Sequence, residues 1–423
     1  MTSDVSPTLE TLRQAVRGGA AIRLRQRLAP AGGPGSKVFP PTHEGGQYAW
    51  ETRRVAGQEL RCVLLDSVQS QANRMELALL DALRAGRLAL PLVEARFAGF
   101  PDIGAVSTLE APHRIADAIF RDATLDGVPF RDSVVGRAFI EATIRDAGGL
   151  YRWCPTALVF GMWDSTALAQ GAGLGTKFQR CIASEIVGFG AVPGVLTKSR
   201  RDPLETNKAA VVYAAHGGTD WTAFPNEADK DKSGEAVLFR RKDGAAAEAG
   251  KPSAINHSSV PPSFHTADKA YLTVAVGEPV RGGVTVDYAE LCAVLSLPGL
   301  RRLRFPRPDG SADAARNEAA RSVLAALALA ALALQREQGY DLRSRCLLIP
   351  EGAAGYELIA ADGSATALRL DADAACALLA AAVAAAAGHG LEWPQAPVVL
   401  EPEPKLLELV RRSRAATGAE SAE

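Results

Sequence analysis

The chain has 423 residues, of which 47% are hydrophobic, and its 47 Lys and Arg residues nearly balance 48 Asp and Glu residues, for a net charge of -1. Disorder needs low hydrophobicity and high net charge together, so this composition excludes an intrinsically disordered protein. It also excludes a histone-like polycation, while the length allows two or three domains or one elaborated domain.

The charge is spread unevenly along the chain. Residues 1–202 hold 24 Lys and Arg against 20 Asp and Glu, a net +4, and the remaining residues hold 23 against 28, a net -5. Because this asymmetry is small, an anionic partner would have to be bound by a local patch of basic residues.

The first part of the chain predicts mixed helices and strands. Residues 7–17 predict a short helix, and residues 20–28 alternate between apolar and basic side chains as a strand does. Residues 61–65 predict a second strand, followed by a helix with a polar start that continues to residue 84. Residues 106–150 favour helices, and residues 156–163 are a candidate buried strand.

The second part of the chain begins with a change in composition. The stretch from residue 200 to residue 263 is polar and irregular, which indicates an exposed insertion. The remaining predicted elements are a strand at 270–276, a helix at 288–296, a long helix at 312–338 and a strand-plus-helix unit from 346 onward. Since strands and helices mix without a regular βαβ order, we predict an α+β fold.

Several classes of site and location are disfavoured. The six cysteines are dispersed without a Cys-x-x-Cys pair, so we expect neither structural zinc nor a disulfide scaffold, and no cofactor. The N-terminus lacks a secretory signal, and the apolar runs at 323–334 and 374–387 are shorter than the roughly 20 residues of a membrane span. We therefore expect a cytoplasmic protein that contacts no membrane.

No catalytic constellation can be assembled from the sequence. The stretch from Gly171 to Lys177 fails the Walker pattern because Thr176 precedes the lysine, and it also fails the dinucleotide spacing. The six histidines are dispersed, and none falls in an H-E-x-x-H or H-x-E pattern; they are His43, His113, His216, His257, His265 and His389. We expect no catalytic residue and no metal site.

Arginines occupy one face of the first predicted strand. Arg23, Arg25 and Arg27 alternate with apolar residues, and side chains two apart on a strand are about 6.5 Å from each other, comparable to successive phosphates of an extended single strand. An edge strand protected by charge explains the same pattern equally well.

Two further clusters support a nucleic-acid interface in the first half of the chain. Phosphate contacts commonly come from Arg and Lys together with short polar side chains. The candidates are Gln71, Asn73 and Arg74 at a helix start, Lys177 and Arg180 one helical turn apart, and Lys198 and Arg200 in a basic segment. Trp163 could stack on a base, but its apolar approach sequence favours burial.

The sequence resembles a CRISPR-associated family in several blocks. These are residues 64–74, 155–166, 177–180, 184–188 and 199–204, with later blocks at 255–258, 261–262 and 300–306. In these blocks the chain is similar to the RAMP-superfamily backbone subunit of the type I-U (I-G) effector complex, a Cascade-like assembly. Arg201 departs from the apolar residue expected in its block.

The resemblance implies an RNA-recognition-motif-like (ferredoxin-like) palm with inserted fingers and thumb. It implies a non-catalytic subunit that binds crRNA, oligomerises along it in a helical filament with other Cascade subunits, and supports recognition of the target DNA strand. Arg23, Arg25, Arg27, Gln71, Asn73, Arg74, Lys177, Arg180, Lys198 and Arg200 are the expected RNA contacts, with Trp163 as a stacking candidate, and His257 is the expected thumb residue near the target strand.

Domain boundaries and two rival functions complete the expectations. We expect an RNA-binding body at 1–335, with a thumb-like insertion at 207–263, and a C-terminal extension at 336–423. The rivals are a metal-independent CRISPR RNA processing endoribonuclease that uses His43 or His257, and a protein-only scaffold.

Overall fold

The structure is a computed structural model that describes residues 6–164, 177–240, 249–265 and 282–422. For residues 196–198, 263–265 and 417–422 it describes the backbone only. The helices are α1 (Leu9–Gly18), α2 (Val68–Arg84), α3 (Ala118–Arg121), α4 (Val134–Ile140), α5 (Gly148–Trp153), α6 (Pro155–Phe160), α7 (Leu297–Arg302), α8 (Ala314–Glu337), α9 (Ala372–Ala387) and α10 (Pro404–Ala422).

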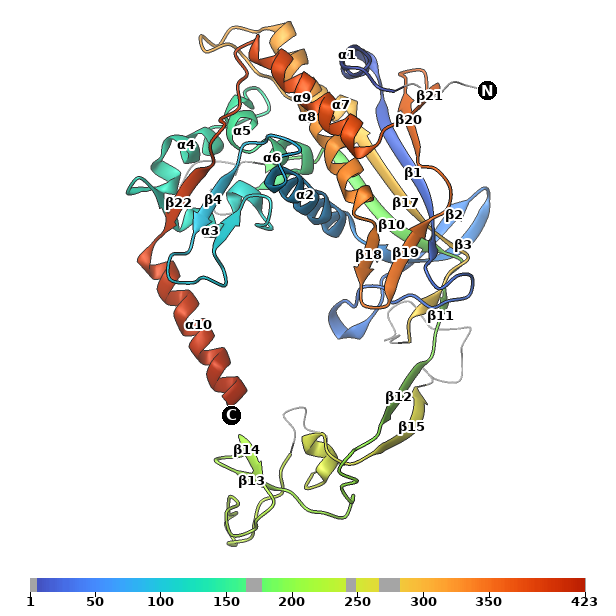
Figure 1. Ribbon diagram of the computed structural model, residues 1–423, viewed down its shortest axis with the longest axis vertical. Coiled ribbons are helices and arrows are strands. Elements are labelled where there is room, and N and C mark those ends of the chain that lie inside the picture. The colour runs from blue at the N-terminus through green and yellow to red at the C-terminus, as the bar shows by residue number, and fades with distance from the viewer. Residues whose placement is uncertain (1–5, 165–176, 241–248, 266–281, 423) are drawn as a thin grey trace. The chain divides into compact units, whose positions relative to one another are not determined.

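A large antiparallel sheet forms the centre of the first compact unit, and the α+β prediction is confirmed (Figure 1). Its strands, in spatial order, are β18 (Tyr340–Arg343), β19 (Cys346–Pro350), β1 (Ala21–Pro30), β17 (Tyr288–Ser296), β10 (Ile182–Phe189), β3 (Gln58–Asp66) and β2 (Trp50–Val55), and β20 (Gly355–Ile359) pairs with β1 and with β21 (Ala365–Leu368).

Helices α2, α8 and α9 lie together on one side of this sheet (Figure 1). The apolar run Val323–Leu334 of α8 is almost completely buried among α1, α2, α6, α7 and α9, because alanine and leucine alone line that stretch after Val323. Among the described residues α8 is the one helix long and apolar enough to cross a membrane, and 83% of its most apolar window is buried inside the protein. Burial of this kind is typical of a core helix.

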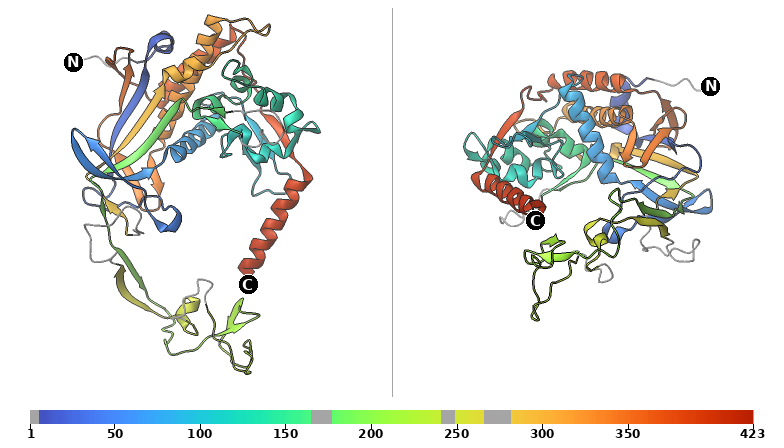
Figure 2. Two further views of the ribbon diagram at one scale, coloured as in Figure 1. Left: turned by 180° about the vertical axis from the view of Figure 1, so that it is seen from behind. Right: turned by 60° about the horizontal axis from the view of Figure 1, so that its bottom comes forward.

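A smaller mixed sheet lies beside α3 in the same unit (Figure 2). Its order is β5 (Ala105–Ser107), β4 (Val93–Arg96), β22 (Val398–Pro402), β6 (Ala123–Leu125) and β7 (Val128–Pro129), with β22 parallel to β4. The remaining pairs are β8 (Met162–Trp163) with β9 (Lys177–Phe178), β11 (Val192–Pro193) with β16 (Val284–Thr285), β12 (Leu196–Arg200) with β15 (Val260–His265), and β13 (Tyr213–Ala215) with β14 (Asp220–Thr222).

The chain divides into two compact units. Residues 1–44, 48–192 and 284–409 form the first, and residues 45–47, 193–283 and 410–423 form the second. The predicted thumb-like insertion (207–263) lies within the second unit. In the predicted C-terminal extension, β18 to β21 belong to the same sheet as β1, and β22 belongs to the smaller sheet. The boundaries of the domains themselves stay a prediction.

Two predicted elements are wrong and one is outside the described residues. Residues 156–163 form mainly α6 and not a strand, because Pro155 starts a helix and a short buried apolar run has no distinguishing period. Residues 288–296 form the strand β17 and not a helix, since Ala289, Leu291, Ala293 and Leu295 are buried with a period of two. The strand predicted at 270–276 lies outside the described residues.

Candidate nucleic-acid interface

The arginine face of β1 exists as the alternation predicts. Ile22, Leu24 and Leu28 are buried, and the arginine side chains point to the opposite face of the sheet. However, β1 is paired on both sides, by β17 and by β19 and β20, so the edge-strand explanation is wrong. The ion pairs on this face are Arg23–Glu357 at 2.6 Å, Arg25–Glu290 at 2.9 Å and Arg27–Glu351 at 3.9 Å.

These ion pairs change the electrostatics of the face. Glu290 accepts three hydrogen bonds from the Arg25 guanidinium, and this contact raises the pKa of Arg25. The Arg27 guanidinium also lies 3.8 Å from the centroid of the Tyr288 ring. A phosphate group would have to compete with a carboxylate at each arginine, so this face alone is a weak anion site.

The start of α2 serves the core and not solvent. Gln71 is fully buried; its Nε2 donates to Asp66 Oδ2 at 2.7 Å, and its Oε1 accepts from Ser184 Oγ. Its prediction as an RNA contact is therefore corrected: no polar atom of this side chain is left for a phosphate. Arg74 also donates to the buried Asp66, at 3.1 Å, and to the carbonyl of Leu342, whereas Asn73 is exposed.

The β8–β9 pair presents an exposed aromatic ring beside a cation. Trp163 is 61% exposed, so its predicted burial is wrong: β8 leaves the buried helix α6 at Gly161, and Trp163 is the residue that reaches solvent. Lys177 is its partner across the pair, with its Nζ 6.0 Å from the indole centroid. Stacking on a base stays a prediction for Trp163.

Gly161 and a buried ion pair fix the position of this hairpin. Gly161 has φ +84°, and a Cβ atom there would lie 2.8 Å from the backbone nitrogen of Arg180. The Gly161 carbonyl accepts a hydrogen bond from Arg114, whose guanidinium binds Glu76 of α2 through two further bonds of 2.7 Å. Thus α2 and the hairpin are joined through one buried arginine.

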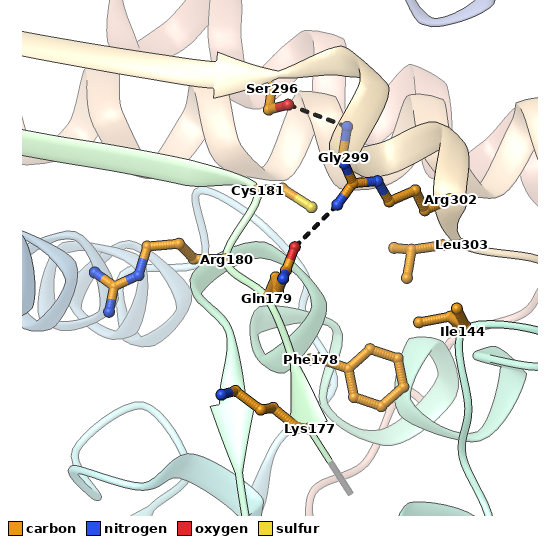
Figure 3. A pocket seen from close by; sticks show the side chains of 10 residues that line it. All are labelled: Ile144, Lys177, Phe178, Gln179, Arg180, Cys181, Ser296, Gly299, Arg302 and Leu303. Atoms are coloured by element: carbon orange, nitrogen blue, oxygen red, sulfur yellow. Dashed lines mark hydrogen bonds between the residues drawn. The ribbon is translucent and has the colours of Figure 1, made fainter.

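A pocket of about 320 Å³ lies next to β9, between this strand and α7 (Figure 3). Figure 3 shows Phe178, Ile144 and Leu303 gathered on one side, and Arg302 reaching Gln179, to which it donates a hydrogen bond of 2.9 Å. The lining residues are Ile144, Lys177, Phe178, Gln179, Arg180, Cys181, Ser296, Gly299, Arg302 and Leu303.

The cations around this pocket lack carboxylate partners within the described part of the chain. We call Lys177, Arg180, Arg302 and Arg304 the hairpin patch; all four are exposed. Arg302 donates to the Gln179 amide and Arg304 to the carbonyl of Arg301, which are neutral acceptors. Positive charge therefore remains uncompensated here, in contrast to the β1 face.

Arginines behind the patch add to this charge. Arg301 donates to the carbonyls of Val16 and Gly19, and Arg321 to the carbonyl of Leu303. Burial, together with Arg304 and Arg301, lowers the pKa of Arg321 to about 10. The sequence assigned no role to Arg302 and Arg304; the signal that marks them is the basic run at 301–307, which the fold brings next to β9.

In the second unit two distant sequence blocks meet. Arg200 donates to the carbonyls of His257 (2.7 Å) and Ser258, so its guanidinium supports the chain at 257–258. A hydrogen bond from the Thr206 side chain, together with those that Asp202 accepts from the amides of Leu204, Thr206 and Ser258, lowers the pKa of Asp202 to about 2. The side chain of Lys198 lies outside the described residues.

His257 is half-buried in the same unit, and its ring lies 6.2 Å from that of Trp221 in an edge-to-face arrangement. Its predicted role near the target strand stays a prediction. No group of three or more His, Cys, Asp or Glu side chains within the described ranges could hold a metal ion.

Comparison with known families matches part of the chain. The model of a family described as "CRISPR-associated protein GSU0053" matches residues 22–193, which run from β1 to β11 and include Lys177 and Arg180. No curated protein matches the chain. The match covers less than half of the chain and makes this part of it similar to a CRISPR-associated family.

Proposed function

We propose that this protein is a non-catalytic, crRNA-binding backbone subunit of a type I CRISPR interference complex of the Cascade-like kind. In this proposal several copies line the guide RNA, other Cascade subunits complete the cytoplasmic complex, and base pairing between the guide and the target DNA strand supplies sequence specificity. The family match supports the CRISPR role, and the hairpin patch supports the contact with RNA.

The main support for RNA binding is a group of cations without carboxylate partners among the described residues, next to an exposed aromatic ring. A subunit that binds any guide must contact phosphates independently of sequence, and basic grooves with aromatic platforms do this for single strands. The hairpin patch and Trp163 offer both elements on one hairpin and the adjoining helix. The β1 arginines, each opposite a glutamate, offer much less.

The direct test removes the hairpin patch. The variant K177A, R180A, R302A and R304A is expected to lose at least about tenfold in affinity for a single-stranded guide RNA, measured by fluorescence anisotropy. The matched control replaces Arg17, Arg54, Arg84 and Arg96 by alanine, since these arginines are also exposed but are paired with glutamates. Equal affinities for the two variants would contradict this assignment of the RNA site.

The two rival functions give different outcomes. A processing endoribonuclease would cut repeat RNA at a defined position, and substitution of His43 or His257 would abolish the cut. If the protein is a protein-only scaffold, its purified native complex would contain no nucleic acid, and the ultraviolet absorbance ratio of the complex would be that of protein alone. Our proposal expects neither result.

A further inference from the structure

The pocket beside the hairpin patch combines an apolar wall with a basic side. Phe178 and Leu303 are 4% and 5% exposed, so they form a fixed wall, and Ile144 is 54% exposed at the pocket mouth. Lys177 and Arg180 belong to the same lining but extend on the other side of the β9 chain from Phe178 (Figure 3). The volume of about 320 Å³ suits a small molecule or one unit of a polymer.

Arg302 is the side chain suited to an anion in this pocket. One nitrogen, Nη1, donates to Gln179 Oε1, and the remaining guanidinium donors have no partner among the residues that the structure describes. This single bond fixes the planar group without neutralising it. A guanidinium fork of this kind matches the oxygens of a phosphate.

We propose that this pocket takes a single nucleotide, with its base against Phe178, Ile144 and Leu303 and its phosphate on Arg302. The apolar wall favours a flat, weakly polar group, and no carboxylate is present among the described lining residues to attract a cation. The Gln179 amide can donate to a base edge. The nucleotide can belong to an RNA strand or be free; only the first source rests on the proposed function.

The experiment fills the pocket without changing its charge. Ile144→Trp places a large side chain at the mouth, and Val134→Trp, at another exposed apolar position that does not line the pocket, is the control. Each protein is mixed with a single-stranded RNA that carries 4-thiouridine, and cross-linked peptides are mapped. In wild type and V134W we expect cross-links within 177–181 or 297–303, and in I144W a loss of about tenfold in their yield.

A second arm uses AMP and adenosine as free ligands in equilibrium dialysis. Saturable binding of AMP that I144W abolishes assigns the pocket to a free nucleotide. Arg302→Gln is expected to remove the preference for AMP over adenosine, a readout that does not depend on filling the pocket. An unchanged preference would remove Arg302 from the proposal.

The two proposals fail separately. RNA that binds the hairpin patch without cross-links in these segments, together with no saturable AMP binding, overturns the nucleotide pocket and leaves the proposed function standing. AMP bound in the pocket of a protein that binds no RNA overturns the proposed function and leaves the pocket standing.

Discussion

The guanidinium of Arg25 illustrates how a partner strand decides what a residue can do. Its partner Glu290 lies on β17, 265 residues further along the chain, and holds the guanidinium through hydrogen bonds of 2.9 Å. The alternation in β1 correctly predicts the face to which Arg25 points. The neighbouring carboxylate, however, neutralises the positive charge that would attract a phosphate.

We therefore predict that the double variant R25A and E290A retains its affinity for single-stranded RNA. Since Arg25 is 56% exposed, the pair contributes at most about 1 kcal/mol to the free energy of unfolding. Urea denaturation and RNA titration by anisotropy measure both quantities. A loss of RNA affinity as large as that of the hairpin-patch variant would reinstate the β1 face as an RNA site.

Arg114 is the residue whose removal we expect to cost most. Its side chain is 10% exposed and that of Glu76 is 3% exposed, so Arg114→Ala leaves a carboxylate buried without its partner. We expect the free energy of unfolding to fall by about 3–5 kcal/mol, measured by urea denaturation.

The matched control for this prediction is the double variant R114M and E76L, which removes both charges and keeps the apolar volume. It is expected to be clearly more stable than R114A, because replacement of a buried ion pair by apolar residues is often neutral. Equal losses in the two variants would show that packing, and not the unpaired carboxylate, sets the cost.

At the scale of elements, the β8–β9 hairpin depends on one glycine. Gly161 ends α6 with φ +84°, where a side chain is strained and would also meet the backbone of Arg180. Gly161→Ala is expected to destabilise the protein by more than the roughly 1–3 kcal/mol of backbone strain alone. Gly99→Ala is the control, since Gly99 has φ +88° but open space around it.

Urea denaturation compares the two glycine variants. If both lose the same stability, the close approach of the Gly161 backbone to Arg180 is unimportant and only the dihedral angle matters. A larger loss for G161A supports the hairpin as a tightly packed element.

The turn after β12 is a second element fixed by one side chain. Asp202 has a pKa of about 2 in the folded state, below its ordinary value of 3.8, because the Thr206 side chain and the backbone amides of Leu204 and Ser258 donate hydrogen bonds to its carboxylate. A depressed pKa stabilises the folded state above pH 3.8, and this contribution is lost as the pH falls from 3.8 to 2.

We predict that Asp202→Asn increases backbone hydrogen exchange in residues 199–206 and 257–259 at neutral pH. In wild type, exchange in these residues should also rise as the pH falls from about 4 to about 2, the window set by the two pKa values. The D202N variant should lack this rise. Exchange measured by mass spectrometry tests both. Asp220→Asn, at an exposed residue of the same unit, is the control.

At the scale of the whole molecule, the net charge of -1 hides a functional asymmetry. The described ion pairs neutralise most arginines of the β1 face, whereas the hairpin patch keeps its charge. Binding of RNA should therefore depend on salt through a few side chains and not through the total charge.

The slope of log affinity against log salt concentration measures this. Each cation that contacts a single strand contributes about 0.7 to the slope, so the fourfold hairpin-patch variant should reduce its magnitude by up to about 2.8. The control with Arg17, Arg54, Arg84 and Arg96 replaced should keep the wild-type slope. An unchanged slope in the hairpin-patch variant would show that other residues bind the phosphates.

The sequence by itself determined the elements whose pattern is local. The alternation of 20–28 specified β1, the capped amphipathic stretch after Asp66 specified α2, and the Ala- and Leu-rich run specified the core helix α8. The spacing of apolar residues and the capping of a helix depend only on residues close together in the chain. These elements could therefore be predicted without knowledge of their tertiary contacts. The α+β class followed from their mixture.

Only the tertiary structure decided which charges are free and which apolar segments are strands. Glu290 and Glu357 come from strands far along the chain and Glu351 from the residue after β19. Arg302 of α7 reaches Gln179, which follows β9. Short apolar runs carry no period of their own, so packing made 155–160 a helix and 288–296 a strand. Electrostatic potential depends on distance in space, and the fold alone sets those distances.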